Sequence, residues 1–78
     1  MKMKINEAQW SVIASAEING CGIWIRALDT DCGTLYFVEH EGKNKELVED
    51  YIGFCEYQYA RKKFNKAFTK LNLDFLGL

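Results

Sequence analysis

The residues best suited to nucleophilic chemistry in this chain are a single histidine, His40, and three cysteines. A nucleophile needs a base within hydrogen-bonding reach and a third group that orients the base. Cys32 and His40 flank one segment of strand-like composition, so they lie at opposite ends of it and cannot meet locally. We therefore expect His40 to be exposed at a strand end and Cys32 to be an exposed thiol in a turn. Cys21 and Cys55 are expected on core faces, as small hydrophobic residues.

Metal and phosphate chemistry also lack their usual sequence patterns here. A structural zinc site has four nitrogen or sulfur ligands, usually with two cysteines close together in sequence, and no such pair occurs. The chain has no P-loop, dinucleotide-binding glycine motif or EF-hand loop. Asp29 and Asp31 fall in a turn-like segment, where aspartate commonly bonds its own backbone. Because so small a core also leaves little room for a catalytic cleft, we expect no enzyme, no metal and no cofactor.

Charge is strongly segregated along the chain, although the net charge is only −1. Residues 29–56 hold eight acids against two lysines, a net charge of −6, and residues 61–70 hold five bases and no acid. The acids are Asp29, Asp31, Glu39, Glu41, Glu46, Glu49, Asp50 and Glu56, and the bases are Arg61, Lys62, Lys63, Lys66 and Lys70. The middle of the chain is thus expected to repel nucleic acid, and its last part to attract it.

The length of 78 residues predicts a single domain, 1–78. No apolar run has the length of a signal peptide or a membrane span, and the odd number of cysteines is not typical of a disulfide framework. We expect a cytoplasmic protein without a membrane partner.

The Asn19-Gly20 pair favours a two-residue type I′ hairpin turn, because both residues tolerate positive φ. Such a turn fixes the pairing of the flanking strands, and it gathers eight apolar residues on one face. The expected pairs are Ile18 with Cys21, Ala16 with Ile23, Ala14 with Ile25, and Val12 with Ala27. The alternative is a helix over 6–18, with Asn6 as its N-cap and Gly20 as the C′ residue beyond its end, followed by a β-hairpin and C-terminal helices.

The segment 34–40 has the composition of a third strand, after a turn-rich loop at 29–33. A five-residue loop would place Leu35 and Phe37 on the inner face. Tyr36 would then lie beside Arg26, and Val38 beside Trp24, on the outer face. The sequence therefore predicts a three-stranded antiparallel meander with strands at about 10–18, 21–28 and 34–40.

The rest of the chain shows helical spacing of apolar residues in two stretches, 44–58 and 60–71. At about 100° per residue the second stripe is rotated by roughly 130° from the first, so we predict two helices or one helix with two packing faces. The apolar segment 71–78 is expected to fold onto the core or to bind a second chain. The predicted fold class is α+β, with the meander packed on one face by these helices.

Two functions fit this arrangement. The outer face would present Trp24, Arg26, Tyr36 and Val38, residue types that include common interface anchors. Around them would lie the acids Asp29, Asp31, Glu39, Glu41, Glu46, Glu49 and Asp50. This pattern predicts a protein-binding module for a basic partner that handles nucleic acid. In size and element order the chain is similar to the small inhibitors that phages encode, anti-CRISPR proteins among them. That resemblance carries no residue motif, and it implies a non-enzymatic inhibitor that occludes its partner's surface.

The alternative function is nucleic-acid binding through the basic segment 61–70. Lys62, Lys66 and Lys70 follow one another at four-residue intervals, so on a helix they form a stripe that could follow phosphates. The opposite charges of the two segments also allow a homodimer.

Overall fold

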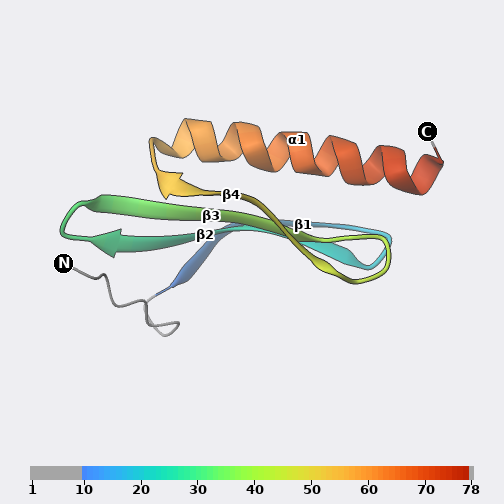
Figure 1. The fold of residues 1–78 in the computed structure, drawn as a ribbon, viewed down its shortest axis with the longest axis horizontal. Helices are drawn as coiled ribbons and strands as arrows, with labels where there is room; N and C mark the ends of the chain where they lie inside the picture. Colours follow the sequence, from blue (N-terminus) through green and yellow to red (C-terminus); the bar gives the residue numbers. More distant parts are fainter. Residues whose placement is uncertain (1–9, 78) are drawn as a thin grey trace.

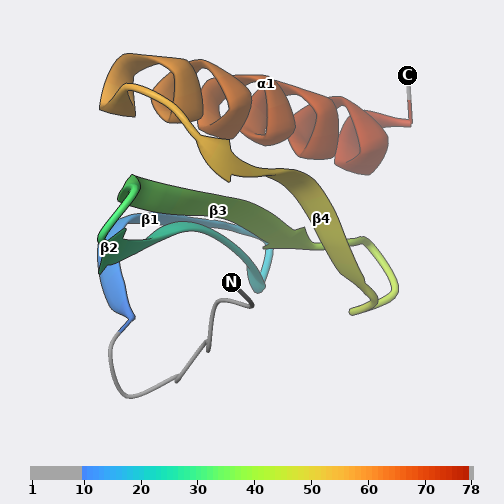
Figure 2. The same ribbon diagram turned by 60° about the vertical axis from the view of Figure 1, so that its left-hand side comes forward.

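The structure is a computed structural model that describes residues 10–77, and it forms one four-stranded antiparallel sheet covered on one face by a helix (Figure 1). The strands are β1 (Ser11–Ile18), β2 (Cys21–Thr30), β3 (Gly33–Glu41) and β4 (Leu47–Phe54), and they neighbour one another in chain order. The helix is α1 (Tyr57–Leu76). Figure 2 shows α1 along one face of the curved sheet. The α+β class is confirmed, whereas the predicted three strands are in fact four.

The first hairpin has the predicted two-residue turn. Asn19 and Gly20 have φ values of 49° and 82°, and Ile18 pairs with Cys21 as the turn type requires. The register shifts between Val12 and Ala14, because a β-bulge adds one residue to β1. Val12 consequently pairs with Arg26 instead of Ala27. The alternative helix over 6–18 is wrong from residue 11 onward, where the chain is strand β1; its first residues, 6–9, lie outside the described part.

The β2–β3 connection is shorter than predicted, and this changes which side chains share a face. Thr30 pairs with Gly33 across a two-residue turn instead of a five-residue loop. The Thr30 hydroxyl donates a hydrogen bond to the Gly33 carbonyl (2.8 Å) and accepts one from the Cys32 N–H (3.1 Å). A one-residue slip turns every side chain of a strand to the other face. Val38 therefore pairs with Ile25 in the core and is fully buried.

The predicted helix over 44–58 is wrong, because residues 47–54 form strand β4. A bulge between Val38 and Glu39 adds one residue to β4, so Val48 and Tyr51 face the same side although they are three residues apart. Three-residue spacing is also the signature of a helix, which explains the misinterpretation. A turn held by hydrogen bonds between Gly42 and both Lys45 and Glu46 leads into the strand.

The predicted helix over 60–71 is confirmed as part of one longer helix, α1. Its buried residues recur at helical spacing and pack on the inner strand residues. The core contains Ile18, Cys21, Ile23, Ile25, Val38, Ala60, Phe64, Ala67 and Leu71. The apolar end continues the helix to Gly77, whose φ is 77°. Phe75 packs against the core from this end, while Leu73 and Leu76 are exposed.

Candidate functional site

The sheet face turned away from α1, here called the outer face, is the main candidate site. Its side chains form rows across the strands, because antiparallel partners point to the same side. The rows are Val12, Arg26, Phe37, Ile52; Ser15, Trp24, Glu39, Glu49; Glu17, Gly22, Glu41, Leu47; and Leu28, Leu35, Phe54. Leu28 and Leu35 are buried, so the exposed apolar surface of the last row comes from Phe54.

The centre of the outer face is a polar cluster around Glu39, a residue that is 6% exposed. One carboxylate oxygen, Oε1, accepts a hydrogen bond from Trp24 Nε1–H at 3.1 Å and lies 2.7 Å from Arg26 Nη2. The Arg26 guanidinium also lies 5.4 Å from the centre of the Trp10 ring and 5.8 Å from that of Phe37. The two rings meet edge-on at 4.1 Å. Glu39, the one buried carboxylate among residues 10–77, and the Arg26 cation beside it thus neutralise each other.

A shallow groove of about 520 Å³ crosses this cluster. Its lining comes from three strands and the start of β4: Val12, Ser15, Trp24, Arg26, Glu39 and Leu47. Val12 and Leu47, at its two sides, are 62% and 64% exposed. Ile52 and Phe54 add further exposed apolar surface on the same face. Large apolar side chains with this exposure, next to a fixed Trp–Arg–Glu cluster, can bury area against another molecule.

The sequence-based site is partly displaced by the register of β3. Trp24 and Arg26 lie on the outer face as predicted, but the predicted placement of Tyr36 and Val38 there is wrong. Tyr36 faces the helix, where its ring lies 6.2 Å from that of Tyr57. The residues that replace them, Phe37 and Glu39, could have been found only by recognising the two-residue turn after Thr30. Trp10, Val12 and Leu47 were missed because their positions depend on bulges and on β4.

Several of the predicted acids are used inside the fold. The Glu41 carboxylate accepts a hydrogen bond from the Gly22 N–H at 2.9 Å, and Asp29 accepts one from the Thr34 hydroxyl, also at 2.9 Å. Asp50 bonds His40, as described below. The acids exposed to solvent are Asp29 and Asp31 at the second turn, Glu46 before β4, Glu49 on the outer face and Glu56 before the helix. Glu17, outside the predicted set, is a further exposed acid on the outer face.

His40 is buried, with 3% of its surface exposed, so its predicted exposed position is wrong. It lies on the inner face, where its Nδ1 atom is 2.6 Å from Asp50 Oδ2 across the β3–β4 pair. The prediction failed because β4 was not recognised as a strand. This strand lies beside His40 and supplies its hydrogen-bonding partner, Asp50. Cys21 is buried as predicted and its thiol donates to the Gly42 carbonyl at 3.2 Å, while Cys32 is exposed. Cys55 is half-buried against the core, as predicted for a core-face cysteine.

The basic segment lies on α1, on the opposite side of the molecule from the outer face. Lys62, Lys66 and Lys70 are exposed. The flank of the helix toward β4 carries Lys63 and Lys66, which line a cavity of about 170 Å³ together with Asp50. Arg61 packs its guanidinium over the Phe64 ring at 4.7 Å. The stripe is therefore present, although one acid lies at its side.

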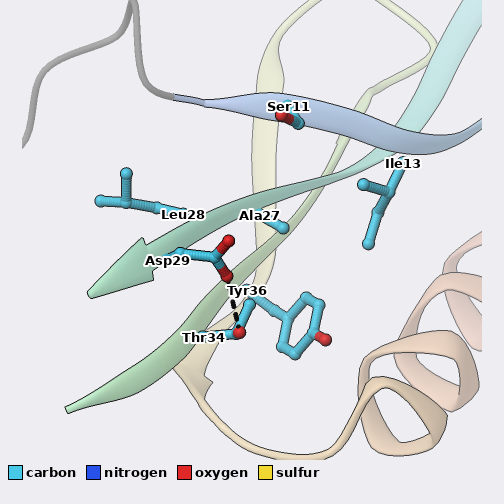
Figure 3. Close-up of a pocket in the computed structure, with 7 residues that line it drawn as sticks. All are labelled: Ser11, Ile13, Ala27, Leu28, Asp29, Thr34 and Tyr36. Carbon is cyan, nitrogen blue, oxygen red and sulfur yellow. Dashed lines mark hydrogen bonds between the residues drawn. The ribbon is translucent and has the colours of Figure 1, made fainter. Parts of the chain in front are cut away.

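A second cavity, of about 480 Å³, opens near the end of the sheet where β2 turns into β3 (Figure 3). Its lining is Ser11, Ile13, Ala27, Leu28, Asp29, Thr34 and Tyr36. Figure 3 shows the Tyr36 side chain on the side of the helix and the Asp29–Thr34 hydrogen bond at the rim. Since that acid and hydroxyl already bond each other, the cavity offers small apolar contacts and the Tyr36 ring to an occupant.

Comparisons with protein-family models, with curated proteins and with solved structures found no match to this chain. Within residues 10–77 no group of three histidine, cysteine, aspartate or glutamate side chains is placed to hold a metal ion. Nor does α1, the one helix of this range, have the length and apolar character needed to cross a membrane.

Proposed function

We propose that this protein is a non-enzymatic protein-binding module whose contact surface is the outer face. The observation that carries the proposal is the exposure of Val12, Leu47, Ile52 and Phe54 around the Trp24–Arg26–Glu39 cluster. Tryptophan and arginine held rigidly at the centre of an apolar patch are the usual anchors of protein interfaces. Little side-chain entropy would be lost there on binding, because the cluster is already fixed by internal contacts.

The charge of the outer face favours a basic partner. Glu17 and Glu49 are exposed on its rows, and Arg26, the basic residue of those rows, is already paired with Glu39. Such rim charges mainly guide encounter and partner choice. The same acids oppose a phosphate backbone, so the aromatic rings of this face are poorly placed to stack nucleic-acid bases.

The inhibitor role is the finer part of the proposal. A domain that occludes a basic, nucleic-acid-handling protein needs only a rigid acidic and apolar face, as in the small phage-encoded inhibitors to which the chain is similar in size. A stoichiometric complex that competes with the partner's nucleic acid is the expected form of this activity.

The test compares two matched leucine-to-arginine variants. Leu47→Arg places a cation on the outer face, and Leu73→Arg places one on the helix, where Leu73 is also exposed. Proteins captured from a lysate by the immobilised wild type should be retained by Leu73→Arg and lost by Leu47→Arg, and capture should weaken as salt rises. Equal retention by both variants, or loss by both, would count against the outer face as the contact surface.

Nucleic-acid binding by α1 is the second candidate, favoured by the exposed Lys62, Lys66 and Lys70. Fluorescence anisotropy with labelled single-stranded and duplex DNA at low ionic strength distinguishes it from the first. The protein-binding proposal predicts no saturable binding. A salt-dependent affinity that disappears in the Lys62→Glu/Lys66→Glu variant would establish this alternative instead.

A further inference from the structure

Gly22 lies on the outer face, within the regular part of the β1–β2 pairing, where the backbone does not require a glycine. It pairs with Glu17, and its φ is not positive. The position requires space instead, because a Cβ atom there would lie 3.0 Å from Cζ3 and 3.3 Å from Cε3 of Trp24. A glycine within a strand often marks the close approach of another group, and here that group is the six-membered ring of the tryptophan.

Two contacts hold the indole of Trp24 in this position. Its Nε1–H donates a hydrogen bond to Glu39 on β3 at 3.1 Å, and its six-membered ring lies against Gly22 on β2. The residue that pairs with Trp24 on β1 is Ser15, which is small and exposed. Trp24 and Ser15 both line the groove of about 520 Å³, so an aromatic ring of fixed orientation borders that groove.

An exposed carboxylate lies beside this ring. Glu17 is on the same face as Trp24, and it belongs to the next outer-face pair along the hairpin from Ser15. Among residues 10–77 Glu17 takes part in neither of the two ion pairs, and none of the four cation–π contacts of that range involves Trp24. An aromatic ring and a carboxylate side by side attract a cation, the ring through its quadrupole and the carboxylate through its charge.

The cation that already lines the groove does not reverse this preference. Arg26 Nη2 lies 2.7 Å from Glu39 Oε1, so its charge is balanced within the fold. Glu17 on β1 and Glu49 on β4 are exposed on either side of that pair and leave the surroundings of the groove negative. Charge complementarity therefore favours a cationic group of the partner as the occupant of the groove.

We propose that the groove receives an arginine side chain of the protein partner, whose guanidinium stacks on Trp24 and pairs with Glu17. This inference rests on the proposed protein-binding function and names the partner's anchor residue. Arginine fits better than lysine, because its planar guanidinium is weakly hydrated and can stack on a ring and pair with a carboxylate at the same time. Its aliphatic stem would cover Val12, which is 62% exposed at the side of the groove.

The test titrates the full chain with two peptides of equal charge, hexa-arginine and hexalysine, at low ionic strength. The readout is the NMR signal of the Trp24 indole N–H, which the Trp10→Phe variant distinguishes from that of Trp10. Hexa-arginine should shift this signal saturably and bind at least about threefold more tightly than hexalysine, because only arginine can both stack and pair. An unmoved Trp24 signal, or equal affinities for the two peptides, would overturn the proposal.

A matched pair of variants separates the Glu17 contact from net charge. Glu17→Gln and Glu56→Gln each remove one exposed carboxylate, the first from the outer face and the second from the start of α1. Glu17→Gln should weaken hexa-arginine binding by at least about threefold, whereas Glu56→Gln should leave it nearly unchanged. Equal losses in the two variants would mean that the peptide responds to net charge alone, and this would contradict the proposal.

Gly22→Ala tests the ring without changing any charge. Its Cβ atom would displace the Trp24 ring, so the preference for hexa-arginine over hexalysine should fall toward equality. An undiminished preference in a folded Gly22→Ala variant would overturn the stacking on Trp24.

The failure of this inference can be distinguished from failure of the proposed function. If lysate proteins are lost by Leu47→Arg and retained by Leu73→Arg, but hexa-arginine leaves the Trp24 signal unmoved, the outer face binds a partner by other contacts and only the arginine anchor is overturned. If the two leucine variants behave alike, the proposed function itself fails, and the arginine anchor fails with it.

Discussion

The two faces of the same sheet are built on different principles. The centre of the inner face is aliphatic: Ile23, Ile25 and Val38 are fully buried under α1. The outer face holds a polar cluster around Glu39, and its residues Val12, Leu47, Ile52 and Phe54 are exposed. Burial drives folding, whereas an exposed apolar patch contributes little until another molecule covers it. The inner face is therefore expected to contribute more to stability than the exposed residues of the outer face.

The largest expected effect is on the inner face. Ile25→Ala removes fully buried methyl groups at the centre of the sheet and should lower the free energy of unfolding by about 2–5 kcal/mol. Ile52→Ala, on the outer face, is the matched control and should cost less than about 1 kcal/mol, because Ile52 is exposed. Urea denaturation of both variants gives the comparison. Similar losses from the two substitutions would mean that the outer face is buried in solution, as in a stable assembly.

The next effect concerns the polar cluster of the outer face. Glu39→Ala leaves Trp24 Nε1–H and the half-buried Arg26 without their acceptor, and should cost about 2 kcal/mol. Arg26→Met removes the other member of the ion pair, the cation. A double-mutant cycle by urea denaturation should find the double variant less destabilised than the sum of the two single ones. Strict additivity would show that the Arg26–Glu39 pair contributes nothing to the free energy of unfolding, and that the contacts of the Trp10 and Phe37 rings hold the cluster together.

The assignment of side chains to these two faces depends on turns and bulges more than on composition. Asn19-Gly20 specifies its own turn, and so the β1–β2 pairing near it could be predicted from the sequence. The Asp31-Cys32 turn has no such signature, since it is held by the Thr30 hydroxyl, and the face of every β3 residue follows from it. The bulge in β4 gives the residues of one face a spacing of three, as in a helix, and for this reason β4 was not predicted as a strand. The α1 stripe was predictable because nothing interrupts its period.

The second turn can be tested directly. Thr30→Val removes both hydroxyl hydrogen bonds of the turn and should cost about 1 kcal/mol in the free energy of unfolding. Thr69→Val is a matched control, because its hydroxyl bonds only the Asn65 carbonyl of its own helix, and it should change stability by less than about 0.5 kcal/mol. Thermal unfolding measures both. An equal response of the two variants would mean that strand packing, not Thr30, fixes the register of β3.

The smallest expected effect is a pH dependence of stability that comes from a tyrosine of the inner face. Tyr51 lies on the inner face opposite Val38, and its pKa is raised above the ordinary value of 10.0, first by a hydrogen bond with the Cys55 side chain and then by desolvation. A raised pKa means that the folded state disfavours the phenolate. The contribution of Tyr51 to stability is therefore complete below pH 10.0 and is lost as pH rises through the higher pKa of the folded state. Urea midpoints should fall more steeply above that pH in the wild type than in Tyr51→Phe, and parallel curves would show that Tyr51 ionises equally well in both states.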